Sequence, residues 1–414
     1  MIHYSTRTAD VSLYISRGSH SVQNRSSANI NQIARILTAI SMFALLLFAF
    51  GAVKMTATGV TRPMNGTLIS PPPNRIFVVN QSGDEYNAWF STNSTLFLSD
   101  TDLAPIEKAM DSRLTNGGEV YFEKGTYLSS KQWRITHQDT VFSAELGTIV
   151  DFMTPNPMNL NDSTSGVLIL ADGVTVQGFT FQNCNMAGIK TKDTNDVVIA
   201  GNQIINSWTG IVLESANNVV VDSNRVVLTQ GDGIYITGDQ STNKSSNHIL
   251  VANNEIQYIG DTGIDVSVGT SNITYSFVDL INNTVEWYND ASRSFTSARA
   301  GITVSIPVTN FTIQGNIINN MKRGMYANGF NGTISRNTIT NFSSGCGIWA
   351  YEGNFTDSNV TVHGNSIYST SALWGISTNK AWTITYNRIT VSGRFGNSAI
   401  NAPNAIKQNN SLYS

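Results

Sequence analysis

Charged residues, histidine and cysteine are scarce in this chain. Asp, Glu, Lys and Arg make up 13% of its 414 residues, and the formal net charge is −3. No Lys/Arg run or basic domain appears, so the sequence lacks the electrostatic footprint of a nucleic-acid-binding protein. The histidines, at positions 3, 20, 137, 248 and 363, form no cluster, and there are two cysteines. A metal site built from His and Cys is therefore not expected.

Helix-period hydrophobic patterns are also missing from the second half, which excludes alternating βαβ units. Leucine-rich repeats share the repeat length found here, but their Leu consensus is absent. What is present is a glycine followed by a small or apolar residue, recurring with a period of about 22 residues, which indicates a solenoid. The positions are Gly188, Gly210, Gly233, Gly263, Gly301, Gly324, Gly347 and Gly375, with Ala399 in the ninth slot.

A second series, of asparagines, recurs at a matching phase. Its members are Asn202, Asn224, Asn254, Asn283, Asn316, Asn337, Asn365 and Asn387. Between the two series, apolar residues alternate in pieces of three to five residues, which predicts short strands joined by turns. Gly and Asn accept left-handed backbone angles, so we expect both series at tight bends. Asn side chains stacked at one corner can also hydrogen-bond along the axis and so pair buried polar groups.

An expected helix and a glycine-rich strand open the repeat region. Residues 102–114 are predicted to form a helix that caps the first coil, with Ser99 or Asp100 as its N-cap. Gly117-Gly118-Glu119-Val120-Tyr121-Phe122 and Gly125-Thr126-Tyr127 follow. Together with the repeats, these motifs resemble the right-handed parallel β-helix of the pectate-lyase-like superfamily, and the opening is similar to the pectate lyase 3-type cap and first strand. The expected fold is an all-β, single-stranded right-handed solenoid over residues 100–414, with the capping helix and one transmembrane helix before it.

This fold has a consequence for the two cysteines. Cys184 and Cys346 fall in the first and seventh Gly-phased coils, and six coil steps of about 4.8 Å place them roughly 29 Å apart. A disulfide needs Cα atoms within about 7 Å. No bridge within the chain is expected.

A charge-free stretch near the start predicts membrane association. Ile36–Val53 is flanked by Arg35 and Lys54 and follows several arginines. Its length suits a transmembrane helix, and the preceding positive charge predicts a cytoplasmic tail at 1–35 and an extracellular remainder. A cleaved signal peptide, and hence a secreted protein, is the alternative. Residues 54–99 are expected to form a stalk and lead-in, kept extended by prolines. Thirteen sequons after position 54 fit a surface glycoprotein, although a chain rich in Asn, Ser and Thr contains many by chance.

Alternation along the Gly-phased strands predicts which side chains face outward. The first and third residues after each glycine point inward, so the second must point out. The resulting column includes Tyr235, Asp265, Tyr326 and Trp349, and Tyr351 lies in the column two residues further on. Exposed aromatic faces at steps of about 5 Å suit stacking on the CH faces of a polysaccharide. The alternative is ordinary aromatic packing between strands.

A charge cluster lies beside these strands. Carboxylates on neighbouring coils are followed by cations on the next two: Asp232, Asp261, Asp265, Arg299, Lys322 and Arg323. Stacked carboxylates can share a proton or bind calcium through hard oxygen ligands, and the cations can hold a uronate. We name Asp232, Asp261 and Asp265 as the candidate calcium ligands. The alternative is that all of these are solvated turn residues, since Asp fits a turn before Gly.

Two functions remain open at this stage. The resemblance implies a polysaccharide ligand, because lyases and epimerases of the superfamily act on acidic polysaccharides and related glycosidases use Asp pairs. The polygalacturonase motifs are absent, so no catalytic residue is carried over from the family. One hypothesis is a membrane-anchored extracellular protein that binds, and cleaves or modifies, a polysaccharide, as a lyase, hydrolase or uronate epimerase. Its candidate catalytic residues are Asp232, Asp261, Asp265, Arg299 and Arg323, and its candidate binding residues are Tyr235, Lys322, Tyr326, Trp349 and Tyr351. The other hypothesis is a non-catalytic surface module for adhesion or structure.

Overall fold

The computed structural model describes much of the chain from residue 76 onward. The described residues are 76–82, 85–90, 95–100, 117–129, 131–153, 165–239, 242–267, 275–287, 300–350, 359–391 and 399–413. The chain divides into two compact units, residues 1–63 and 64–414, and all described residues belong to the second. The expected transmembrane segment Ile36–Val53, the capping helix at 102–114, Arg299 and Tyr351 lie outside them. Within the described ranges no helix is long and apolar enough to cross a membrane.

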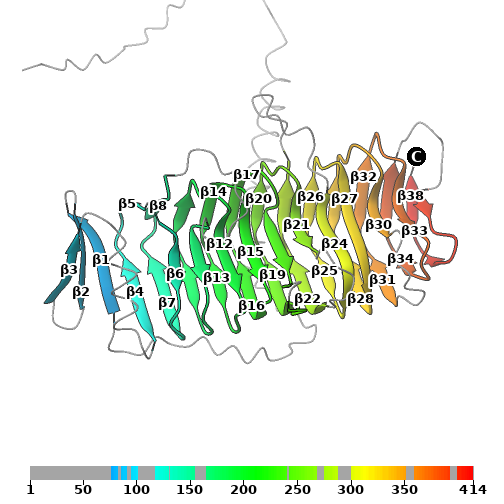
Figure 1. Cartoon of the computed structure of the whole chain (residues 1–414). Coiled ribbons are helices and arrows are strands. Elements are labelled where there is room, and N and C mark those ends of the chain that lie inside the picture. Colours follow the sequence, from blue (N-terminus) through cyan, green and yellow to red (C-terminus); the bar gives the residue numbers. More distant parts are fainter. Residues whose placement is uncertain are drawn as a thin grey trace, which may run out of the picture. The chain divides into compact units, whose positions relative to one another are not determined.

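The second unit is a stack of coils with three strands each (Figure 1). One strand of every coil belongs to the sheet that carries the repeated glycines, here called the Gly-phased sheet. Its strands pair in parallel with the equivalent strands of the coils before and after, as expected for a solenoid. They are β6 (Trp133–Ile135), β9 (Val167–Ile169), β12 (Ala187–Lys192), β15 (Thr209–Glu214), β18 (Ile234–Thr237), β21 (Thr262–Val266), β24 (Ala300–Thr309), β27 (Arg323–Phe330), β30 (Cys346–Ala350), β33 (Trp374–Thr378) and β36 (Ile400–Asn401).

The second sheet follows the Gly-phased strand in each coil. It contains β4 (Gly118–Phe122), β7 (Thr140–Ala144), β10 (Thr175–Gln177), β13 (Val198–Ala200), β16 (Asn217–Asp222), β19 (Asn247–Ala252), β22 (Tyr275–Ile281), β25 (Thr312–Gln314), β28 (Gly332–Ser335), β31 (Val360–His363), β34 (Thr383–Thr385) and β37 (Ile406–Gln408). The long strand β24 joins it to the Gly-phased sheet, because its first half pairs with β21 and its last residues pair with β22.

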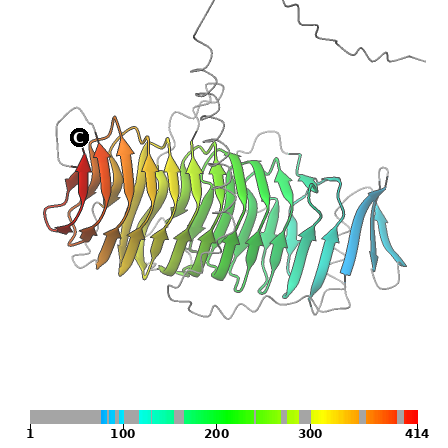
Figure 2. The ribbon, with the colours of Figure 1, turned by 180° about the vertical axis from the view of Figure 1, so that it is seen from behind.

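The third sheet closes each coil. Several of its strands are labelled in Figure 1, and Figure 2 shows the same stack from behind. Its strands are β5 (Thr126–Leu128), β8 (Ile149–Asp151), β11 (Thr180–Gln182), β14 (Gln203–Ser207), β17 (Arg225–Thr229), β20 (Glu255–Gln257), β23 (Thr284–Glu286), β26 (Ile317–Asn319), β29 (Thr338–Thr340), β32 (Ser366–Ser369), β35 (Arg388–Val391) and β38 (Ser411–Tyr413). The expected all-β parallel solenoid is confirmed, and every regular element among the described residues is a strand.

Strand structure begins earlier than the expected boundary at residue 100. Strands β1 (Ile76–Ser82), β2 (Glu85–Phe90) and β3 (Thr95–Asp100) form an antiparallel meander, and β1 also pairs in parallel with β4. The meander thus continues the second sheet at its first edge (Figure 1). It occupies part of the region predicted to be a lead-in. Hairpin pairing leaves no repeat period in the sequence, which is why the periodicity did not reveal these strands.

The repeated glycines are required by packing, not by backbone angle. None of the eight has a positive φ, which corrects the expectation that they sit at left-handed bends. At Gly210 an added Cβ would lie 2.3 Å from Cγ1 of Val226 and 2.5 Å from the carbonyl oxygen of Gly233. The other phased glycines have the same two kinds of neighbour. Each glycine therefore lets a Gly-phased strand approach the third sheet within one coil and the next coil along the axis.

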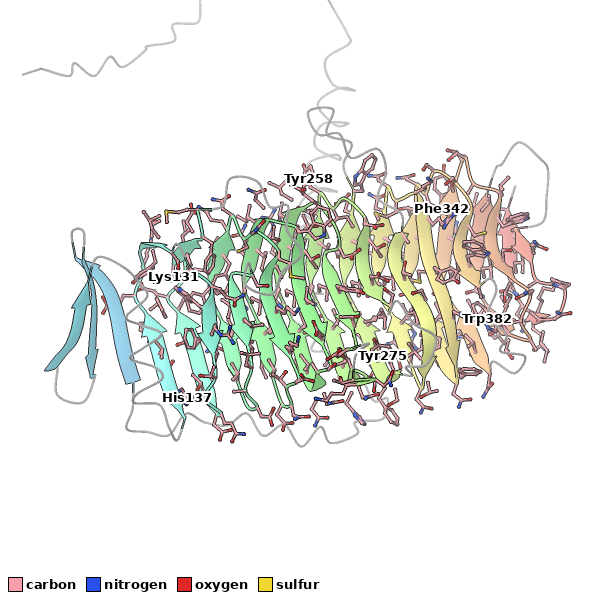
Figure 3. The ribbon with its side chains drawn as sticks, in the orientation of Figure 1. Lys131, His137, Tyr258, Tyr275, Phe342 and Trp382 are labelled. Carbon is pink, nitrogen blue, oxygen red and sulfur yellow. The ribbon has the colours of Figure 1, made fainter. Side chains whose placement is uncertain are left out.

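The interior is filled by the inward residues of all three sheets. Ile211, Ile234 and Ile264, the first residues after their glycines, are fully buried. Large side chains such as Tyr275, Phe342 and Trp382, labelled in Figure 3, are also almost completely inaccessible. The cysteines are free and buried, as expected from their separation in the stack.

The asparagine series forms a continuous buried ladder at one corner. Nδ2 of each residue donates to Oδ1 of the residue in the next coil at 2.9 to 3.1 Å, for example from Asn316 to Asn337. The ladder continues one step beyond the prediction, to Asn410. Left-handed angles occur one residue earlier than expected, at positions such as Ser223, Asn253 and Asn282, because the bend itself precedes each ladder residue.

Candidate functional site

The outward column of the Gly-phased sheet is continuous and in register. Tyr235 pairs with Asp265, Asp265 with Thr303, Thr303 with Tyr326, and Tyr326 with Trp349. All of these side chains are half-buried, whereas the residues on either side of them in each strand are buried. Five consecutive coils therefore present one line of side chains on what we call the outer face.

Two aromatic rings and one guanidinium meet on the outer face. The rings of Tyr326 and Trp349 lie edge to face, with centroids 5.4 Å apart and planes at 70°. The guanidinium carbon of Arg323 is 4.8 Å from the centre of the Trp349 ring, which is cation–π geometry. We call Arg323, Tyr326 and Trp349 the aromatic–cationic cluster. It combines a large apolar surface with a positive charge at one place.

Cys346 is a buried residue at the start of β30, close enough to Arg323 for its charge to act on the thiol. Burial raises the pKa of its thiol to about 11, while a hydrogen bond with Ser377 and the positive charge of Arg323 act in the opposite direction. Arg323 therefore acts electrostatically on the buried thiol and also contacts the Trp349 ring. The raised pKa keeps this thiol in its neutral form near pH 7.

The carboxylate of Asp265 occupies the middle of the outer face. Its Oδ2 accepts a hydrogen bond from Oγ of Ser267 at 2.8 Å, and its Oδ1 is buried. The phenol of Tyr275 lies close to Asp265 and Tyr235. Burial is the main cause that raises the pKa of Tyr275, and the charges of Tyr235 and Asp265 raise it further. Asp265 is thus held in place beside aromatic side chains, in a partly desolvated setting.

The other two candidate carboxylates are engaged at turns between coils. Oδ1 of Asp232 accepts the backbone N–H of Thr262 at 3.0 Å, and the hydroxyl of Thr262 lies 3.5 Å from Oδ1 of Asp261. The contact of Asp232 thus joins one coil to the next. Within the part of the chain that the structure describes, no group of three or more His, Cys, Asp or Glu residues is arranged to hold a metal ion. The calcium site stays an untested prediction.

Three predicted site residues remain to be placed: Lys322, Arg299 and Tyr351. Lys322 is exposed and lies next to Arg323, and its backbone carbonyl accepts the N–H of Ser344 at 3.0 Å. Arg299 and Tyr351 lie outside the described residues. The structure therefore brings together Arg323, Tyr326 and Trp349, and places Tyr235 and Asp265 further along the same column.

Charged residues also lie on earlier coils of the outward columns, although they were not among the predicted site residues. Nζ of Lys190 lies 2.6 Å from a carboxylate oxygen of Glu214, and Nζ of Lys192 lies 3.2 Å from the other oxygen. Lys190 is only 3% exposed, and its column neighbours Leu168 and Val212 are also buried. Alternation along the strands predicts that Lys190, Lys192 and Glu214 point outward. It does not predict that the outward side chains of Lys190 and Val212 are buried.

Comparison with known proteins agrees with the geometry. A family model described as "Right handed beta helix region" matches residues 156–277. No curated protein matches the chain by sequence. The solved structures that resemble it include PfbA, a surface adhesin of Streptococcus pneumoniae, at 15% identity and a TM-score of 0.56, covering 75% of this chain and 86% of the adhesin.

Two carbohydrate-active enzymes are similar to a comparable degree. An exopolygalacturonase from Thermotoga maritima aligns at 14% identity and a TM-score of 0.54, over 74% of this chain and 88% of the enzyme. A lacto-N-biosidase from Eubacterium ramulus aligns at 14% identity and a TM-score of 0.55, over 82% of this chain and 68% of the enzyme. At such identities the likeness concerns the fold. The repeats, the parallel sheets and these matches identify the fold of the chain as a right-handed parallel β-helix.

Proposed function

We propose that this protein binds a polysaccharide or cell-surface glycan on the outer face of the Gly-phased sheet. The aromatic–cationic cluster is the observation that carries the proposal. Tyr326 and Trp349 offer an edge-to-face pair of rings that is half-buried and held by neighbouring coils. Rings fixed by packing lose little entropy when a ligand stacks on them. A sugar presents apolar CH faces and polar edges, and the cluster supplies partners for both.

The column that contains the cluster favours an extended ligand over a compact one. Tyr235 and Trp349 are separated by four coil steps, so at about 4.8 Å per step the line is roughly 19 Å long. The side chains between them are those of Asp265 and Thr303, which are polar, and Tyr326, which is aromatic. A chain molecule lying along the axis can contact all of them. A surface adhesin and two carbohydrate-active enzymes among the structural neighbours are consistent with such a ligand.

Chemical modification of the ligand is the second candidate, and the placement of Asp265 favours it. This carboxylate is partly desolvated, is held by Ser267, and lies in the same column as the aromatic pair. Partial desolvation is the environment in which a carboxyl group is tuned for acid–base catalysis. Asp232 and Asp261, by contrast, have turn contacts that account for them. We therefore assign any chemistry to Asp265 and treat binding as the primary function.

The location that we propose is the cell surface. Ile36–Val53, flanked by basic residues, would anchor the protein with residues 1–35 in the cytoplasm and the solenoid outside, and a cleaved signal would release it instead. In either case the outer face would meet extracellular glycans.

Two assays test the proposed function together. The purified protein is applied to a glycan array, and its best ligands, together with uronate polymers, are then incubated with it and analysed for shortened, unsaturated or epimerised products. Binding without product supports the binding function, and product lost on Asp265→Ala supports the second candidate. Failure to bind any polysaccharide, by a protein whose circular dichroism shows the folded solenoid, would refute both.

A further inference from the structure

Three sequons lie stacked in register on consecutive coils. They begin at Asn310, Asn331 and Asn359, which we call the sequon row, and each is followed by threonine two residues later. The threonines are strand partners, Thr312 with Thr333 and Thr333 with Thr361. Backbone bonds tie the same corners together, from Asn310 N–H to the carbonyl of Phe330 and from Gly332 N–H to the carbonyl of Asn359. The whole motif is thus repeated at one edge of the stack.

The asparagines of the row are accessible. All three are exposed, and Asn310 and Asn331 have φ angles of 56° and 49°. A left-handed residue at the corner directs its side chain away from the strands on either side, which Asn tolerates at low cost. This distinguishes the row from the buried ladder, whose asparagines donate Nδ2 to the next coil and begin no sequon.

Turn chemistry alone does not explain the threonines. Asn218 occupies the corresponding corner of an earlier coil, is exposed, and has a φ of 54°, but valine stands two residues later. An exposed left-handed asparagine at this corner therefore does not need threonine at that position.

We propose that the sequon row is a site of N-linked glycosylation. The donor is a lipid-linked oligosaccharide pyrophosphate. The Nδ2–C1 bond forms as the C1–O bond to pyrophosphate breaks, Nδ2 gives up one proton, and the lipid pyrophosphate leaves. The reaction requires export across the membrane, which the segment Ile36–Val53 is expected to direct, and it does not depend on the proposed glycan-binding function.

The row has a defined relation to the outer face. Asn310 directly follows β24, Asn331 directly follows β27, and Asn359 directly precedes β31. It therefore lies on the connections that leave the strands bearing Thr303, Tyr326 and Trp349. Attached oligosaccharides would border the outer face along one edge. They would leave the rings themselves uncovered and would restrict the approach of bulky molecules from that side.

Steric crowding between oligosaccharides on adjacent coils should determine what fraction of each asparagine in the sequon row is modified. Neighbouring coils are about 4.8 Å apart, so oligosaccharides on adjacent asparagines compete for space. Asn331 has a neighbour on both sides and should be modified least. Asn331→Gln should then increase the modified fraction at Asn310.

The test is peptide mass spectrometry of the full-length protein isolated from its native source. Lys322 and Arg323 lie between Asn310 and Asn331, so trypsin places these two asparagines in separate peptides. We expect each of these peptides to exceed the mass of its sequence by the mass of an oligosaccharide. The extra mass should disappear from the Asn310 peptide in Thr312→Ala and from the Asn331 peptide in Thr333→Ala. The peptide containing Asn218 should have its sequence mass in the natural protein and should gain an oligosaccharide in Val220→Thr, which completes a sequon there. Sequence masses alone for the peptides that contain Asn310 and Asn331 would overturn the proposal.

Discussion

Oδ1 of Asn316 accepts two hydrogen bonds from Asn283, one from the backbone N–H at 2.9 Å and one from Nδ2 at 3.1 Å. Its own Nδ2 donates to the carbonyl of Leu280 at 2.8 Å and to Oδ1 of Asn337 at 3.0 Å. One fully buried side chain thus satisfies polar groups on the coil before it and the coil after it. The same arrangement recurs along the ladder, so its central members should be important for stability.

Asn316→Leu should lower the free energy of unfolding by about 1–3 kcal/mol, because the amide groups of Asn283 and the carbonyl of Leu280 lose their buried partner. Chemical denaturation of the two proteins measures the difference. Asn401→Leu, at an exposed position in β36, is the matched control and should change stability by no more than about 0.5 kcal/mol. Equal effects of the two substitutions would show that the ladder adds little to stability.

Trp349→Ala should weaken binding of a glycan ligand by about 1–3 kcal/mol, by analogy with the stacking of bases on aromatic side chains. The substitution also removes the partner of the Arg323 guanidinium. Calorimetric titration with the best ligand from the array gives the affinity. Tyr386→Ala is the control, because it removes an aromatic ring that is 59% exposed but lies away from the outer face. The affinity of this variant for the glycan should be unchanged. If both variants bind as the natural protein does, the ligand site is elsewhere on the solenoid.

Stability should fall at alkaline pH because of Cys346. Burial raises the pKa of this thiol from 9.0 to about 11 in the folded protein. Above about pH 9 the unfolded chain loses the thiol proton while the folded chain keeps it, so the free energy of unfolding decreases with pH up to about 11. Cys346→Ala should have a shallower slope over this range in denaturation measured at several pH values. Parallel slopes would indicate that the thiol has its ordinary pKa in the folded state.

Ile36–Val53 should hold the protein in the membrane fraction, with protease added to intact cells reaching the solenoid. The physical reason is the length of the charge-free stretch, about 27 Å as a helix, together with the basic residues before it. Immunoblotting of cell fractions and N-terminal sequencing measure this outcome. A mature N-terminus near Ala52 or Thr58 would show instead that the segment is cleaved.

The ladder and the outward column were predictable because a solenoid repeats the same geometry in every coil. Once Asn202 and Asn224 are seen to share a phase, their contact follows, and the same holds for Tyr326 and Trp349. The sequence did not reveal why glycine recurs. That reason is the approach of Val226 to Gly210 across the coil, between residues of different sheets.

The contacts within the site could not be predicted from the repeat, because they depend on side-chain rotamers and on hydrogen bonds at turns. Alternation places Asp232 near the site, but its bond to the backbone of Thr262 is a contact between coils that requires coordinates. The cation–π contact of Arg323 likewise depends on where a long side chain folds, since alternation fixes only the direction of its Cβ.

The asparagine ladder also gives the stack a direction. Every Nδ2 donates toward the following coil, from Asn202 through to Asn410, so the amide dipoles are parallel and each polarises the next. Such a chain of dipoles is weakest at its ends, where an amide has a neighbour on one side only. Equivalent substitutions should therefore cost less at Asn202 than at Asn283.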